Sequence, residues 1–156
     1  MQTITRKFLV KHVPDITGKN HWVLHRFYIY RKNGIVIRVQ SNGDMFELER
    51  KSGTSDLIRN SEKIVITKEE FESIGKIAQD FITRDSYLIS DDFHIVLHVY
   101  HGRFEGLVRV EVEFQSIEQA KKFIPFQWMG NEITSSPLAK DEMLLDLTDD
   151  KFRKLL

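Results

Sequence analysis

The chain has 156 residues, 41% of them hydrophobic and 29% charged, which is enough for one domain with a sizeable core. Lys plus Arg and Asp plus Glu both number 23, so the formal net charge is zero and no overall basic field would attract nucleic acid or an anionic membrane. The absence of cysteine excludes disulfides and thiolate metal sites, and no apolar stretch is long enough to cross a membrane. We therefore expect a cytoplasmic protein that contacts neither nucleic acid nor membrane.

Eight segments alternate apolar and polar residues or are rich in β-branched and aromatic side chains, which is typical of strands. They lie at residues 3–11, 21–31, 34–41, 45–52, 62–67, 81–89, 93–101 and 107–115. Asn33-Gly34 and Asn42-Gly43 supply hairpin turns, so neighbouring strands are expected to pair antiparallel. Because closing such a sheet removes its exposed edges, the sequence predicts a mainly antiparallel α+β fold, an eight-stranded closed β-barrel or tunnel with a few flanking helices.

Three short helices are predicted outside the barrel. Thr67 and Ser116 each precede a Glu or Gln by three residues, the spacing of a capping box that begins a helix. After Thr67, apolar residues recur at the helical period as far as Ile77. Residues 148–156 are expected to form the third helix. No repeat or linker divides the chain, so residues 1–156 are predicted to be a single domain.

Along several predicted strands, polar side chains share one face while apolar ones share the other. The polar sets are Thr3, Thr5 and Lys7; Arg38 and Gln40; Glu47, Glu49 and Lys51; and Arg109, Glu111 and Glu113. Alternation alone is equally typical of strands whose polar faces are exposed to solvent outside a barrel. Glu111 and Glu113 form an acid pair placed to hold a metal, because residues two apart on a strand lie roughly 7 Å apart on one face, so long carboxylates can share a cation.

Three segments resemble the CYTH family of triphosphate tunnel enzymes: Thr3-Ile4-Thr5-Arg6-Lys7-Phe8-Leu9-Val10, His101 through Phe114, and Trp128 through Thr134. The resemblance follows nearly the whole chain in order. It implies a polar tunnel for a phosphorylated small molecule, namely a nucleotide, an organic triphosphate or polyphosphate, together with Mg²⁺ or Mn²⁺. By this resemblance the phosphate-binding residues are Lys7, Arg38, Lys51, Arg59, Arg84 and Arg109, and the metal ligands are Glu111 and Glu113. No general acid or base is assigned.

The chain departs from the family's pattern at positions where metal-binding acids are usual. Thr3 and Thr5 replace the acids of the opening Glu-x-Glu-x-Lys motif. Acids are also missing at Val96 and His98 and at Ser61 and Lys63. The pattern is consistent with one cation rather than two, and Glu49 and Glu132 are further acids that could assist.

Three functional hypotheses follow. In the first, the tunnel binds a triphosphate-containing nucleotide or polyphosphate, and metal-dependent hydrolase or cyclase activity is weak or lost. In the second, Glu111 and Glu113 support an active Mg²⁺- or Mn²⁺-dependent triphosphatase, like thiamine triphosphatase, or a class IV-like adenylyl cyclase. In the third, the barrel is an interaction scaffold without a small ligand.

Expectations also follow for two histidines of one predicted strand and for the C-terminal segment. His94 and His98 share a strand face roughly 13 Å apart, too far for both rings to bind one ion, so a phosphate contact or a packing role suits His98 better. Residues 141–156 bring Met143, Leu144, Leu145 and Leu147 close together. That segment could cap one tunnel mouth, pack on the barrel or form a homodimer contact.

Overall fold

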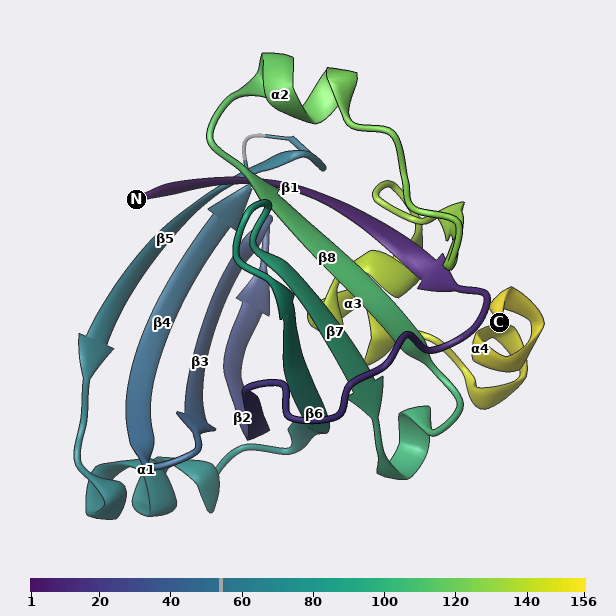
Figure 1. Cartoon of the computed structure of the whole chain (residues 1–156). Helices are drawn as coiled ribbons and strands as arrows, with labels where there is room; N and C mark the ends of the chain where they lie inside the picture. The colour runs from purple at the N-terminus through teal and green to yellow at the C-terminus, as the bar shows by residue number, and fades with distance from the viewer. Residues whose placement is uncertain (54) are drawn as a thin grey trace.

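The computed structural model describes residues 1–53 and 55–156, and its antiparallel sheet closes on itself (Figure 1). Eight strands form the ring in the order β5-β4-β3-β2-β6-β7-β8-β1, and pairing of β1 with β5 completes it. The strands are β1 (Gln2–Val10), β2 (His21–Lys32), β3 (Ile35–Asn42), β4 (Met45–Gly53), β5 (Ile58–Val65), β6 (Asp80–Ser90), β7 (Ile95–Tyr100) and β8 (Val108–Phe114). The predicted eight-stranded closed barrel is confirmed.

A ninth strand, β9 (Met129–Glu132), lies beside the end of β1 and was not predicted. Seven predicted strands match the structure to within two residues, but the fifth begins at Ile58 instead of residue 62. The earlier start follows from tertiary pairing, because Gln2–Ile4 of β1 pair with Ile58–Asn60 and so close the ring. Asn33 and Gly34 both have positive φ, 54° and 72°, as the hairpin turn between β2 and β3 requires.

Four α-helices occur in the described residues: α1 (Lys68–Gly75), α2 (Ile117–Lys122), α3 (Asp141–Leu144) and α4 (Asp149–Leu155). Thr67 begins α1 with the predicted capping box, and Phe71 packs on Phe27 and Phe46 on the outside of the sheet. The expectation that Ile77 belongs to this buried face is wrong. The helix ends at Gly75, a residue of low helix propensity, and Ile77 is 75% exposed.

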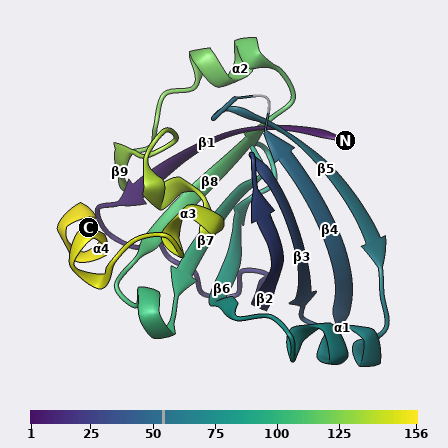
Figure 2. The same ribbon diagram turned by 180° about the vertical axis from the view of Figure 1, so that it is seen from behind.

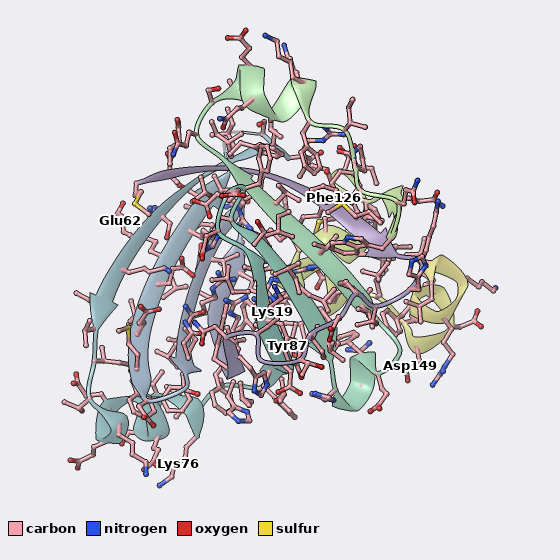
Figure 3. All side chains as sticks on the ribbon, viewed as in Figure 1. Lys19, Glu62, Lys76, Tyr87, Phe126 and Asp149 are labelled. Carbon is pink, nitrogen blue, oxygen red and sulfur yellow. The ribbon has the colours of Figure 1, made fainter. Side chains whose placement is uncertain are left out.

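Many apolar side chains of the barrel point outward, and part of this outer face is covered by other elements. On the outer face of β1, β7 and β8, residues such as Phe8, Leu97 and Val110 form a buried cluster with Ala120 of α2 and Met129 of β9. Charged side chains such as Glu62, Lys76 and Asp149 project from the outside of the molecule (Figure 3). Where these apolar side chains lie outside, the polar faces of the same strands point into the barrel.

The C-terminal segment, residues 141–156, packs against the barrel. α3 and α4 gather on the side of the molecule where β9 lies (Figures 1 and 2). Leu144 and Phe152 join Tyr28 and Tyr100 of the barrel in one buried cluster, and Leu145 and Leu147 pack on it. The leucines of this segment thus pack on the barrel, as one of the three expectations proposed. None of the helices in the described part of the chain has the length and apolar character needed to cross a membrane.

Candidate functional site

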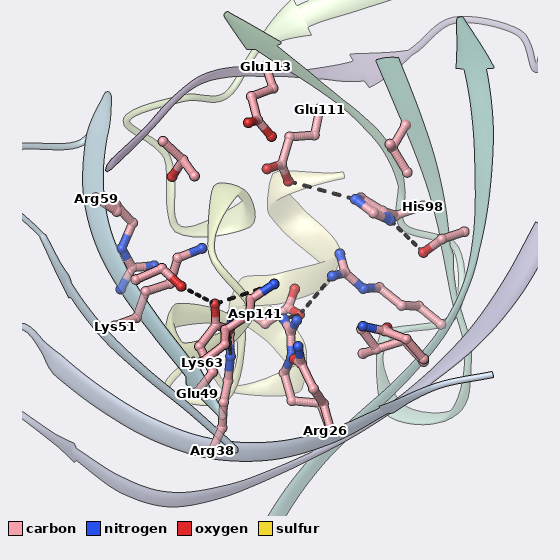
Figure 4. A pocket seen from close by; sticks show the side chains of 18 of the residues that line it. Arg26, Arg38, Glu49, Lys51, Arg59, Lys63, His98, Glu111, Glu113 and Asp141 are labelled. Carbon is pink, nitrogen blue, oxygen red and sulfur yellow. Dashed lines mark hydrogen bonds and ion pairs between the residues drawn. The ribbon is translucent and has the colours of Figure 1, made fainter. Parts of the chain in front are cut away.

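A polar cavity of about 260 Å³ lies inside the barrel, and strands from all sides of the ring contribute to it (Figure 4). It contains every residue predicted to bind phosphate or metal. These residues are Lys7, Arg38, Lys51, Arg59, Arg84, Arg109, Glu111 and Glu113. The polar strand faces therefore converge inside the barrel, and the alternative in which they face solvent outside is wrong.

Basic side chains outnumber acidic ones around the cavity. Among the described residues, eight lysines and arginines and five acidic residues line it. The basic residues are Lys7, Arg26, Arg38, Lys51, Arg59, Lys63, Arg84 and Arg109, and the acidic residues are Glu49, Glu111, Glu113, Asp141 and Glu142. The chain has no net charge, but the cavity has a local excess of positive charge because more basic than acidic residues lie on the inner faces of the strands.

Arg38 and Glu49 are Cα partners on β3 and β4 and form a buried ion pair. The Arg38 Nε and Nη2 atoms lie 2.9 and 2.5 Å from Glu49 Oε1, and Ser61 Oγ donates to Oε2 at 2.5 Å. Burial alone would raise the pKa of Glu49, but the Arg38 charge outweighs it and holds this pKa well below its usual range. The carboxylate fixes the guanidinium in place at the wall of the cavity.

Asp141 of α3 lies within ion-pair distance of three arginines at once. Its side chain is 1% exposed, and its Oδ2 lies 2.5 Å from Arg26 Nη1 and 3.7 Å from Arg84 Nη2. Its Oδ1 accepts from Arg109 Nη2 at 3.0 Å and from the Tyr100 hydroxyl. Burial would raise the pKa of Asp141, but the three arginines together hold it well below its usual range. This carboxylate therefore anchors one wall of the basic cavity.

Glu142, the next residue, pairs with the remaining arginine of the cavity, with Arg59 Nη1 2.6 Å from Glu142 Oε1. Even so, some arginine N–H donors have no acceptor among the described residues. The Nε atoms of Arg59, Arg84 and Arg109 are buried and lack a hydrogen-bond partner among the described residues. A buried donor without a partner is costly, so an acceptor that comes within reach of these N–H groups would be favoured.

Two buried lysines, Lys7 and Lys51, also line the cavity. Lys7 Nζ donates to the Ala139 carbonyl at 2.7 Å, whereas Lys51 has neither an ion pair nor a side-chain hydrogen bond within the described ranges. Burial lowers the pKa of Lys7 to about 8. Burial and the neighbouring Arg38 charge lower the pKa of Lys51 to about 7. Both values mean that extra negative charge in the cavity would be accompanied by proton uptake.

The two acids of β8 differ in their surroundings. Glu111 Oε2 lies 3.8 Å from Lys7 Nζ and 3.7 Å from His98 Nε2, and Lys7 holds the Glu111 pKa well below its usual range although burial would raise it. Glu113 is 41% exposed and lies 3.7 Å from His94 Nδ1. Burial and the Arg84 charge lower the pKa of His98 to about 3, so its ring is neutral.

Carboxylate oxygens facing a polyanion site are suitable ligands for Mg²⁺ or Mn²⁺. In the part of the chain that the structure describes, however, no three His, Asp or Glu side chains converge closely enough to hold an ion by themselves. A cation at Glu111 and Glu113 would need phosphate or water oxygens to complete its shell. The residues thus fit a cation that binds together with an anionic ligand.

The residues that depart from the family's pattern mostly lie at the same cavity. Thr3, Ser61, Lys63, Val96 and His98 line it. Thr5 is the Cα partner of Glu113 across β1 and β8. Glu132 instead binds Arg6 Nη2 at 2.6 Å, away from the cavity, so the expectation that it assists a metal is wrong.

The sequence prediction missed Arg26, Asp141 and Glu142 as cavity residues. Arg26 shares its face of β2 with Leu24 and Tyr28, so the sequence of β2 does not mark that face as polar. Asp141 and Glu142 belong to a four-residue helix whose place depends on distant contacts. No local signal in the sequence identifies these two acids.

Comparisons with known proteins agree with the fold. No protein-family model matches the sequence. An inorganic triphosphatase from Nitrosomonas europaea is 33% identical over 151 residues, covering 92% of this chain and 97% of that protein. The crystal structure of the inorganic triphosphatase NE1496 superposes with a TM-score of 0.69 at 28% identity, over 91% of this chain and 93% of that one. The PH1012 protein from Pyrococcus horikoshii shares the fold, with a TM-score of 0.58 at 13% identity over 77% and 84% of the two chains. The chain therefore belongs to the CYTH family of triphosphate tunnel proteins.

Proposed function

We propose that the barrel cavity binds inorganic triphosphate and that a divalent cation at Glu111 and Glu113 supports its slow hydrolysis. The observation that carries the proposal is the convergence of eight basic side chains on one cavity, where Lys51 and three arginine Nε atoms have no partner among the described residues. Several fixed and mobile donors around one space suit an anion with many oxygens. The similarity to an inorganic triphosphatase supports the choice of ligand.

Some residues of the cavity would contact the triphosphate, and others would position those contacting residues. Lys7 and Lys51 supply point charges, while Asp141, Glu49 and Glu142 hold the arginines in fixed orientations. Such preorganised cations stabilise charge that develops on phosphoryl oxygens without having to reorganise. A divalent cation, when bound, would further neutralise those oxygens. We expect slow turnover because Thr3 and Thr5 bring no carboxylate to the end of β1 nearest Glu113.

Phosphorus NMR of the purified chain tests this proposal. Inorganic triphosphate, ATP and thiamine triphosphate are each followed over hours with Mg²⁺, Mn²⁺ or chelator. We expect metal-dependent products from inorganic triphosphate that disappear in Glu113→Ala and in Lys51→Ala. Lys122→Ala is the matched control, because Lys122 is 76% exposed and pairs only with Glu118 among the described residues. Products that persist in chelator, or binding that is insensitive to Lys51→Ala, would contradict the proposal.

A second candidate is binding without turnover. The observation that favours it is the lack of three converging metal ligands in the described residues. It predicts line broadening of the triphosphate resonances without new products, persisting in chelator and in Glu113→Ala. Conversion of ATP into cyclic AMP in the same spectra would instead indicate a cyclase. The homodimer and the cytoplasmic location remain predictions from the sequence.

A further inference from the structure

His98 of β7 is held in a defined orientation inside the cavity (Figure 4). Its Nδ1 lies 2.8 Å from the hydroxyl of Ser86, which is itself fully buried on the neighbouring strand β6. Its Nε2 faces Glu111, 3.7 Å from Oε2, and the His98 side chain is 7% exposed. A hydrogen bond on one ring nitrogen fixes the direction of the other, which is the usual arrangement of histidines that bind metal ions.

The space between His98 and Glu111 has dimensions that suit an ion. A separation of 3.7 Å is too long for a direct hydrogen bond. Two neighbouring ligands in an octahedral shell, a nitrogen and an oxygen each about 2.1 Å from the ion, lie about 3.0 Å apart. A small side-chain adjustment would therefore bring both atoms onto one cation. Lys7 Nζ lies 3.8 Å from the same carboxylate oxygen and is held by the Ala139 carbonyl.

We propose that His98 Nε2 and Glu111 bind the divalent cation of the cavity together, and that this nitrogen–oxygen pair makes the site prefer a transition-metal ion such as Mn²⁺ or Co²⁺ over Mg²⁺. Magnesium prefers an all-oxygen octahedral shell, whereas imidazole is a good ligand for transition metals. Because no three such ligands converge in the described residues, water or phosphate oxygens would fill the remaining positions, and Glu113 would contact the ion through one of those waters. The inference rests on the proposed function, since it refines which cation acts there.

Pulsed electron paramagnetic resonance of Mn²⁺ bound to the full chain tests the nitrogen ligand directly. We expect nitrogen modulation from one imidazole in the wild type and its loss in His98→Gln. His94→Gln is the matched control, since His94 lines the same cavity but is 58% exposed and faces Glu113. Competition titrations should show Mn²⁺ affinity falling at least about tenfold in His98→Gln. Mg²⁺ affinity should change much less, and His98→Asp should bind Mg²⁺ better than the wild type does.

The outcomes separate this inference from the proposed function. Bound Mn²⁺ without nitrogen modulation in the wild type, or modulation lost in His94→Gln instead, would overturn the role of His98 while leaving triphosphate binding intact. Imidazole-bound Mn²⁺ in a protein that neither binds nor cleaves triphosphate would support the metal site and overturn the proposed function. Should His98→Gln fail to fold, the wild-type spectrum, repeated with protein labelled with ¹⁵N at histidine only, still decides whether an imidazole binds the ion.

Discussion

Arg38 and Glu49 face each other across β3 and β4 with side chains that are only 5% and 3% exposed. The guanidinium that was predicted to bind phosphate is therefore already neutralised in the free protein. Breaking a buried ion pair by removing one partner is strongly destabilising, because the remaining charge is left uncompensated. The pair thus contributes to the stability of the barrel and also sets the orientation and net charge of Arg38 at the cavity.

Glu49→Gln should lower the free energy of unfolding by about 3 kcal/mol, because Arg38 keeps its charge and loses its counter-ion. Added triphosphate should restore more stability to this variant than to the wild type, since phosphate oxygens replace the missing carboxylate. Urea unfolding with and without triphosphate measures both effects. Glu62→Gln is the control: Glu62 is 75% exposed, 3.8 Å from Arg50, and its loss should cost less than about 0.5 kcal/mol. A Glu49→Gln protein as stable as the wild type would contradict this prediction.

Asp141→Asn should bind triphosphate about tenfold more tightly in chelator. The substitution preserves the shape of the side chain but leaves Arg26, Arg84 and Arg109 without their shared negative charge. An entering anion then no longer competes with an internal carboxylate. Isothermal titration calorimetry measures the affinity, with Asp146→Asn as control because Asp146 is 71% exposed. Weaker binding in Asp141→Asn would show instead that the carboxylate acts mainly by orienting the arginines.

Leu144→Ala should destabilise the protein by about 3 kcal/mol, because Leu144 is fully buried in the cluster that joins α3 to the barrel. The same change should weaken triphosphate binding, because displacing α3 removes the acceptor atoms of Asp141 and Glu142 that orient the cavity arginines, whereas Asp141→Asn keeps an acceptor and removes only the charge. Thermal unfolding and calorimetry provide the two measurements. Met143→Ala is the matched control, because Met143 lies one residue away and is 37% exposed. Equal stability losses in the two variants would contradict this packing role for α3.

The part of the site that the sequence predicted is the part built by strands. Alternation along a strand is local, so it correctly assigned Arg38, Lys51 and Glu111 to one face. It left open whether that face pointed inward, which depends on ring closure between β1 and β5 and on the apolar layers outside. The family resemblance favoured the interior, and the structure agrees.

The rest of the site depends on packing between distant segments. Asp141 enters the cavity because Leu138 and Leu144 on either side of it are buried against barrel residues such as Tyr100. No periodic pattern encodes that placement in a helix of four residues. The early start of β5 at Ile58 likewise depends on β1, more than fifty residues away in the chain. Local sequence signals cannot report contacts of this kind.

Triphosphate affinity should fall as the pH rises above about 7, because the lowered pKa of Lys51, about 7, means that the free protein has lost this charge at higher pH. A bound polyanion raises that pKa again, so binding takes up a proton. The folded-state pKa lies below the unfolded value, so the stability of the ligand-free protein should instead increase as the pH rises from about 7 towards 10.

Calorimetry at pH 8 in buffers with different ionisation enthalpies measures this proton uptake. Lys51→Arg should reduce the number of protons taken up on binding by nearly one. The positive charge at this position is kept, because arginine does not deprotonate in this range. Any uptake that remains reflects Lys7, whose pKa is about 8, and the ligand itself. Lys122→Arg is the matched control on the exposed surface and should leave the uptake unchanged. Equal proton uptake by the wild type and Lys51→Arg would mean that Lys51 is not the group whose charge the ligand restores.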